Sequence, residues 1–116
     1  MIFIKIDPQA CTVTTVEGDA GNESFCNLIG CQFLDVCARQ DNYDALLIDD
    51  DGLSLDPQPP AFSFNGFGPI HGIAIVAGCD EDGKTTEPVY TVEQVLRRIK
   101  WLGNICTKPA IFVTSW

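Results

Sequence analysis

The chain has 116 residues, of which 46% are hydrophobic and 20% charged, a composition that fits one folded domain and argues against intrinsic disorder. Its formal net charge is −9, and all 16 acidic residues lie within residues 1–95, which hold only three bases. This acidic part would repel a phosphate backbone, so direct binding of DNA or RNA is not expected, whereas a basic protein surface would be attracted.

The chain begins with an apolar segment, Met1 to Lys5, that is too short and too soon interrupted to be a signal peptide. No apolar run approaches the ~20 residues that a membrane-spanning helix needs. We therefore expect a cytoplasmic protein without a membrane partner. In that compartment its six cysteines would be reduced thiols.

Alternating apolar residues predict a strand over residues 2–6 and its antiparallel return over residues 11–17. A short helix is expected over residues 20–29, with Asp19 as its N-cap. Gly30 follows this helix and suits the left-handed position just beyond a helix end.

The middle of the chain predicts a second hairpin, formed by strands 31–38 and 45–49 around the polar turn 41–44. Residues 53–68 are expected to be an irregular loop, because their prolines exclude a helix and a central strand. The phenylalanines of this loop would pack back onto the core.

Residues 69–79 predict one buried strand, which an acidic turn follows. A final helix is expected from Thr91, the N-cap of a capping box with Gln94, to about Leu102. A short strand over residues 110–114 would complete the chain.

These elements predict an α+β fold, with a mainly antiparallel β-sheet and two α-helices packed against it. We find no internal repeat and no linker, so the fold is expected to be a single domain over residues 1–116. The final helix would contact the sheet through an apolar stripe. That stripe comprises Val92, Val95, Leu96, Ile99 and Leu102.

Two predicted strands end in acidic clusters closed by glycine, Asp49-Asp50-Asp51-Gly52 and Asp80-Glu81-Asp82-Gly83. A calcium loop of the EF-hand type needs glycine at its sixth position and glutamate at its twelfth. The residues found there are Ser54 and Pro60 after Asp49, and Thr85 and Thr91 after Asp80. We therefore interpret both clusters as exposed turns, and a cation site of another type is kept as an alternative.

The spacing of Cys26, Cys31 and Cys37 contains no Cys-x-x-Cys pair, which argues against structural zinc. Cys31 and Cys37 share one face of the predicted strand and are interpreted as small hydrophobic residues of the core. No metal and no other cofactor is expected.

His71 is the only histidine, so Ser-His-Asp or Cys-His catalysis would have to use it. At the start of a strand, a lone histidine is more often a hydrogen-bonded structural residue. The sequence also contains no phosphate-binding glycine loop, no Gly-x-Ser-x-Gly and no His-Glu-x-x-His. We therefore expect no catalytic residues and no enzyme activity.

The last predicted helix carries Arg97, Arg98, Lys100 and Trp101 off its apolar stripe. Arg97 and Trp101 are four residues apart and would stack as a cation–π pair on one helix face. Exposed tryptophan and arginine are enriched at binding hot spots. The alternative is that Trp101 folds back against Trp116 or the sheet edge and covers the core.

Several short motifs follow one another along the chain in a characteristic order. They are an N-terminal Ile-x-Ile-Asp-Pro, a Thr-Val-Thr strand, a helix ending at Gly30, Leu47-Ile48-Asp49-Asp50-Asp51-Gly52, Asn65, Pro69-Ile70-His71-Gly72, the strand Ile73 to Val76 and Asp80-Glu81-Asp82-Gly83. This order resembles a domain-of-unknown-function family of small phage and mobile-element proteins, over about residues 2–95. The cysteine-rich middle and the phenylalanine-rich loop depart from it. The resemblance implies an α+β fold and a viral or mobile-element origin, and it carries over no catalytic residues.

We expect a small acidic, non-enzymatic protein of phage or mobile-element type that binds a host protein in the host cytoplasm, as an inhibitor or counter-defence factor. One alternative is a small-molecule or cation-binding protein, or an enzyme, that uses His71 and the acidic turns. Another is an accessory subunit that forms a homo-oligomer through the Trp101 helix. The residues expected to bind the partner are Arg97, Arg98, Trp101, Asp49, Asp50, Asp51, Asp80, Glu81 and Asp82.

Overall fold

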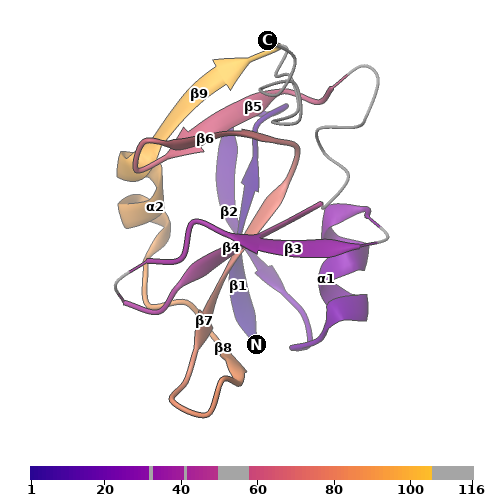
Figure 1. Cartoon of the computed structure of the whole chain (residues 1–116), viewed down its shortest axis with the longest axis vertical. Coiled ribbons are helices and arrows are strands. Elements are labelled where there is room, and N and C mark those ends of the chain that lie inside the picture. Colours follow the sequence, from indigo (N-terminus) through magenta and orange to yellow (C-terminus); the bar gives the residue numbers. More distant parts are fainter. Residues whose placement is uncertain (32, 41, 50–57, 106–116) are drawn as a thin grey trace, which may run out of the picture.

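The structure, a computed structural model, describes residues 1–31, 33–40, 42–49 and 58–105, and within them nine strands and two helices (Figure 1). The helices are α1 (Asn22–Ile29) and α2 (Val92–Arg98). All strand pairs in this part of the chain are antiparallel. The predicted α+β class with a mainly antiparallel sheet is therefore confirmed, although the strands form two sheets rather than one.

The first sheet has the strand order β2-β1-β7-β4-β3, with the short strand β8 beside β7. Its strands are β1 (Ile2–Asp7), β2 (Thr12–Glu17), β3 (Leu34–Cys37), β4 (Ala45–Asp49), β7 (Ala74–Cys79) and β8 (Thr85–Thr86). The two predicted hairpins, β1–β2 and β3–β4, are confirmed. β7 lies between β1 and β4, at the centre of the sheet. Both of its faces are covered there, which fits the continuous apolar run of its sequence.

Both faces of the first sheet are covered, because successive side chains of a strand point in opposite directions. On one side, Ile75 packs with Phe3 of β1 and Phe25 of α1, and the two aromatic rings meet edge to face at 5.0 Å. On the other side, Val76 belongs to a larger cluster that includes Val95 of α2 and residues of the second sheet. The two helices therefore lie on opposite sides of the first sheet (Figure 1).

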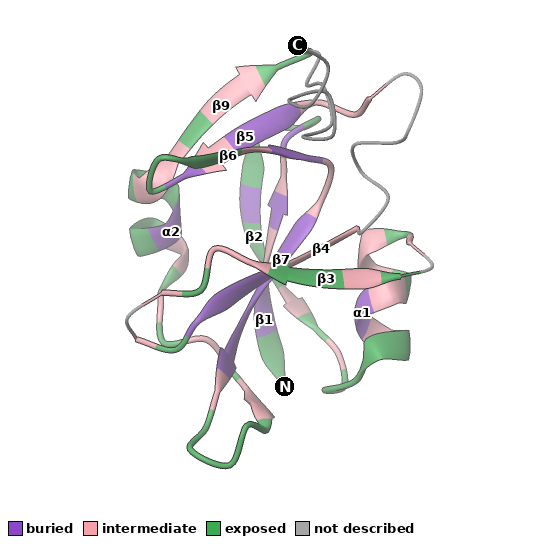
Figure 2. Cartoon of the chain, in the orientation of Figure 1, coloured by how far each residue is buried: buried purple, intermediate pink, exposed green. Residues whose placement is uncertain are grey.

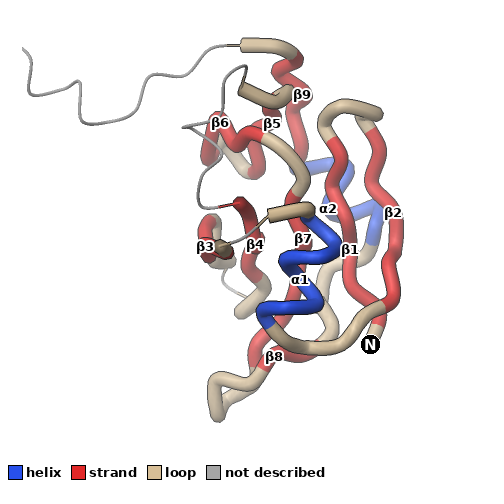
Figure 3. The backbone as a smooth tube through the Cα atoms, turned by 90° about the vertical axis from the view of Figure 1, so that its right-hand side faces the viewer, coloured by secondary structure: helices blue, strands red, loops and turns tan. Residues whose placement is uncertain are grey.

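The second sheet has the order β6-β5-β9 and lies to one side of β1 and β2 (Figure 3). Its strands are β5 (Ala61–Phe64), β6 (Phe67–His71) and β9 (Ile99–Gly103). Phe62 and Phe64 of the central strand β5 are fully buried and join the core cluster of the first sheet (Figure 2). The larger cluster of the core is thus enclosed between the two sheets and α2.

The expectation of an irregular loop over residues 53–68 is wrong for β5 and the start of β6, and residues 53–57 lie outside the described residues. The prolines excluded a strand only up to Pro60, and β5 begins directly after it. Phe62 and Phe64 do pack onto the core, whereas Phe67 is 52% exposed.

The single strand predicted over residues 69–79 is also wrong, because the chain changes sheets within it. β6 ends at His71 and β7 begins at Ala74, with Gly72 between them at φ 89°. This left-handed conformation favours glycine, and the Gly72 N–H donates a hydrogen bond to the Pro60 carbonyl at 3.0 Å. The turn therefore directs one apolar run into two different sheets.

α2 begins as predicted, since the Thr91 hydroxyl accepts from the Gln94 N–H and the Gln94 side chain accepts from the Thr91 N–H. It ends at Arg98 and not near Leu102, because β9 follows it and pairs with β5. Opposite β9, the open edge of β5 offers backbone hydrogen bonds. Ile99 and Trp101 are residue types that favour such a strand, so the predicted helical continuation is lost.

α1 begins at Asn22 after Gly21, which makes no side-chain capping bond, so the prediction of Asp19 as N-cap is wrong. Gly30 adopts the expected left-handed conformation at the helix end, with φ 82°. The predicted strand over residues 110–114 lies outside the described residues.

Candidate functional site

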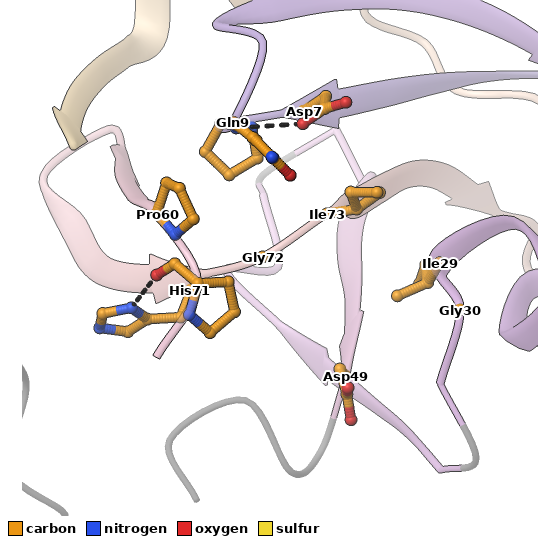
Figure 4. A pocket seen from close by; sticks show the side chains of 11 residues that line it. Asp7, Gln9, Ile29, Gly30, Asp49, Pro60, His71, Gly72 and Ile73 are labelled. Atoms are coloured by element: carbon orange, nitrogen blue, oxygen red, sulfur yellow. Dashed lines mark hydrogen bonds between the residues drawn. The ribbon is translucent and has the colours of Figure 1, made fainter. Parts of the chain in front are cut away.

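A pocket of about 200 Å³ lies where the chain passes between the two sheets (Figure 4). Five parts of the chain form it: the end of β1 with the turn that follows, the end of α1, the last residue of β4, the segment before β5, and the end of β6 with the segment that follows. The lining residues are Asp7, Pro8, Gln9, Ile29, Gly30, Asp49, Pro59, Pro60, His71, Gly72 and Ile73. Residues that are distant in sequence thus meet at one concave surface.

Two carboxylates line this pocket. Asp7 ends β1, and its Oδ1 accepts hydrogen bonds from the N–H groups of Gln9 at 3.0 Å and Ala10 at 3.3 Å. Asp49 ends β4 and is half-buried. The sequence had singled out Asp49 but not Asp7, whose only signal was its place in an Asp-Pro turn after a strand.

His71 is 4% exposed, and its Nδ1 lies 2.7 Å from the Pro59 carbonyl oxygen. A carbonyl only accepts hydrogen bonds, so this contact assigns a proton to Nδ1. The hydrogen bond expected for His71 is therefore present, and its purely structural role stays a prediction. It holds the segment before β5 against the end of β6, which shapes one wall of the pocket.

The acidic cluster after β7 forms the tip of a hairpin that projects from the first sheet (Figure 1). Asp80, Glu81 and Asp82 are all exposed there. The Asp80 Oδ1 accepts from the N–H groups of Asp82 at 2.9 Å and Lys84 at 2.8 Å, and Gly83 adopts φ 81°. The tip is therefore held in one conformation by its own first carboxylate.

The described acid of the first cluster, Asp49, does not lie beside the acids of the second cluster. β4 and β7 are antiparallel, with Ala45 opposite Ala77 and Leu47 opposite Ile75, so their carboxyl-terminal ends lie at opposite ends of the sheet. Asp49 consequently lines the pocket, far from the hairpin tip. Asp50 and Asp51 lie outside the described residues.

The expected basic surface with Trp101 is corrected by the structure. Trp101 lies on β9 and packs edge to face against the buried Phe62 at 6.2 Å, so the helical stacking of Arg97 on Trp101 is not formed. The alternative, in which Trp101 covers the core, describes this packing. The alternative of a homo-oligomer formed through a helix that carries Trp101 lacks such a helix, because Trp101 lies on β9.

Arg98 is also used within the protein. Its guanidinium carbon lies 4.6 Å from the centre of the Tyr90 ring, and its Nη1 donates to the Gln94 carbonyl at 2.8 Å. Arg97 remains exposed at the end of α2. Of the three residues expected to bind a partner here, only Arg97 presents its side chain mainly to solvent.

Asp44 is a buried carboxylate that the sequence analysis placed in a polar turn. It is 0% exposed, and its two oxygens accept from the N–H groups of Val89 at 2.9 Å and Tyr90 at 2.8 Å. The β3–β4 turn is thereby joined to the segment before α2. The available signal was that Asp44 directly precedes the apolar run of β4.

The described cysteines differ in their surroundings. Burial, followed by the charge of Asp35, raises the pKa of Cys37 to about 11, and this residue packs against the core as expected. Cys31 precedes β3 and contacts Cys26, so the shared strand face predicted for Cys31 and Cys37 is wrong. Burial, the hydrogen bond and charge of Cys26 and the charge of Asp49 raise the pKa of Cys31 to about 12.

Among the described residues, no group of three or more histidine, cysteine, aspartate or glutamate side chains could hold a metal ion. Neither α1 nor α2 has the length and apolar character needed to cross a membrane. Comparison of the chain with protein-family models, with curated proteins and with solved structures finds no match, so the resemblance to phage and mobile-element proteins stays a prediction.

Proposed function

We propose that this chain is a small acidic, non-enzymatic protein of phage or mobile-element type that binds a basic surface of a host protein, as an inhibitor or counter-defence factor. The observation that carries the proposal is the projecting β7–β8 hairpin with the exposed acids Asp80, Glu81 and Asp82 at its tip. Such a tip can reach into a positively charged recess of a partner.

Two properties, one of the hairpin and one of the whole chain, favour binding. The hydrogen bonds to Asp80 fix the turn before any partner arrives, so little conformational entropy is lost on association. The net charge of −9 also attracts a basic partner over distances beyond direct contact, which raises the association rate at low salt.

The proposed surface differs from the one expected on the last helix. Trp101 and Arg98 are engaged with Phe62 and Tyr90, so the hairpin replaces them as the main binding element. Arg97 is exposed, but it lies on α2 and is not part of the hairpin surface.

The test is a pair of charge-matched variants. Glu81→Gln with Asp82→Asn removes two tip charges and leaves the Asp80 hydrogen bonds in place, whereas Glu17→Gln with Asp19→Asn removes two exposed charges elsewhere. Partners are captured from host lysate with the wild type, and the affinity of each captured protein is then titrated at low and high salt. We expect the tip variant to bind at least tenfold more weakly and the control to bind as the wild type; equal losses would reject the hairpin.

A second candidate function rests on the pocket. Its two carboxylates, Asp7 and Asp49, and its volume of about 200 Å³ suit a small organic cation such as a primary amine, smaller than the ligands of most drug-sized pockets. This is the alternative in which His71 contributes to a ligand site, here as a structural wall.

Thermal unfolding with a panel of small amines tests this alternative. A bound amine should raise the melting temperature of the wild type and not that of Asp49→Asn, and the exposed Asp35→Asn serves as the control. If no amine shifts the wild type, or if both variants respond equally, the pocket is not a cation site.

A further inference from the structure

The end of α1 brings two cysteines together through its backbone. The Gly30 N–H donates to the Cys26 carbonyl at 2.7 Å, and the Cys31 N–H donates to the same carbonyl at 3.0 Å. With Gly30 at φ 82°, these bonds describe a helix end in which the residue after the glycine returns to the last turn of the helix. In such an end the side chains at these two positions meet, and here both are thiols.

The thiols are in contact, and both are accessible. Cys31 is hydrogen-bonded to Cys26 through its side chain, and both residues are half-buried thiols. Cys26 is held by the helix, because the neighbouring Phe25 is buried against Phe3. The pair is therefore positioned by the fold and reachable by a small oxidant.

We propose that Cys26 and Cys31 form an intramolecular disulfide when the protein meets a peroxide, so that the end of α1 is a site of oxidative modification. In the first step one thiol releases its proton, its thiolate attacks the peroxide and the O–O bond breaks; the hydroxide that leaves takes up a proton, so a sulfenic acid and water result. In the second step the other thiol releases its proton, its thiolate attacks the sulfenic sulfur and the S–O bond breaks; the hydroxide that leaves is protonated to a second water. Two thiols and one hydrogen peroxide thus give one disulfide and two waters, with two electrons passing from sulfur to oxygen.

The other described cysteines lack such a neighbour. The Cys11 thiol donates to the Pro8 carbonyl, the Cys79 thiol donates to the Asp80 carbonyl, and Cys37 packs against the core. A thiol with a raised pKa ionises rarely at neutral pH, so the reaction is slow there and faster at higher pH. Such a thiol is also a poor leaving group, and the disulfide once formed resists reduction.

The proposal is tested on the full chain by mapping its cysteines after oxidation. The reduced protein is treated with hydrogen peroxide, remaining thiols are alkylated, and the chain is cut after glutamate and aspartate. This releases residues 24–35, which contain Cys26 and Cys31 and no other cysteine. We expect this peptide to carry no alkyl group and to be lighter than the reduced, unmodified peptide by the mass of two hydrogen atoms. The disulfide should form faster at alkaline than at neutral pH.

The controls separate the folded pair from chance oxidation. Cys37→Ser should leave the cross-linked peptide unchanged, whereas Cys31→Ser and Cys31→Ala should abolish it. In urea the same oxidation should give mixed pairings that include Cys11 and Cys37, because the helix end is lost. The proposal is wrong if the folded wild type keeps a doubly alkylated peptide, if its cysteines join another chain, or if pairing is equally selective in urea.

Discussion

At the scale of single residues, Asp44 shows how a polar residue can be structural and not part of a surface. A buried carboxylate is costly unless hydrogen bonds compensate it, and Asp44 receives them from two successive backbone N–H groups. Gly78 faces it closely, since a Cβ built on Gly78 would lie 3.2 Å from the Asp44 Oδ1. The absence of a side chain at Gly78 therefore leaves room for this carboxylate.

We predict that Asp44→Ala destabilises the protein by about 3 kcal/mol, because two partly buried N–H groups lose their acceptor. Asp44→Asn retains one acceptor oxygen and should lose less. Urea unfolding measures both, with the exposed Asp19→Ala as a control that should stay within about 0.5 kcal/mol of the wild type. Equal stability of Asp44→Ala and the control would show that the clamp contributes nothing.

The conformation or burial of a single residue could be predicted from the sequence where neighbouring residues determine it. Gly30 was predictable because a helix end requires a left-handed residue, and the capping box of Thr91 and Gln94 is likewise set by neighbouring residues. The burial of Asp44 was not predictable, because its partners are more than forty positions away in the chain. Asp7 and Asp49 meet at the pocket for the same non-local reason.

At the scale of elements, the junction of α2 and β9 shows where periodicity stops being informative. The apolar spacing of residues 92–102 fits a helix, and the first seven residues form one. Beyond Arg98, pairing with β5 satisfies backbone groups at an open sheet edge and places Trp101 against Phe62. A tertiary contact thus outweighs a local propensity, which differs by less than a kcal/mol per residue.

The start of α2 gives a prediction at this scale. Thr91→Ala removes the hydroxyl that accepts from the Gln94 N–H and should cost about 1 kcal/mol of stability, whereas Thr91→Ser keeps the hydroxyl and should cost little. Urea unfolding compares the two variants. If serine and alanine lose the same amount, the contribution comes from the methyl group of Thr91 and not from the cap.

At the scale of the whole molecule, the α+β class follows from the sequence, but the division into two sheets does not. Local patterns identified most strands, yet the choice of partners depends on contacts such as those of β5 with β9, which lie far apart in the chain. The small turn at Gly72 decides that β6 and β7 join different sheets. Such a choice is made by the fold as a whole.

The antiparallel pairing of β4 and β7 has a consequence for how this protein can be altered. It separates the hairpin tip and the pocket by the length of the sheet, and the two share no described side chain. Changes in free energy at sites that are distant and share no partner usually add. Substitutions at Glu81 and Asp49 can therefore be combined in one chain, and any departure from additivity would reveal communication between the two ends.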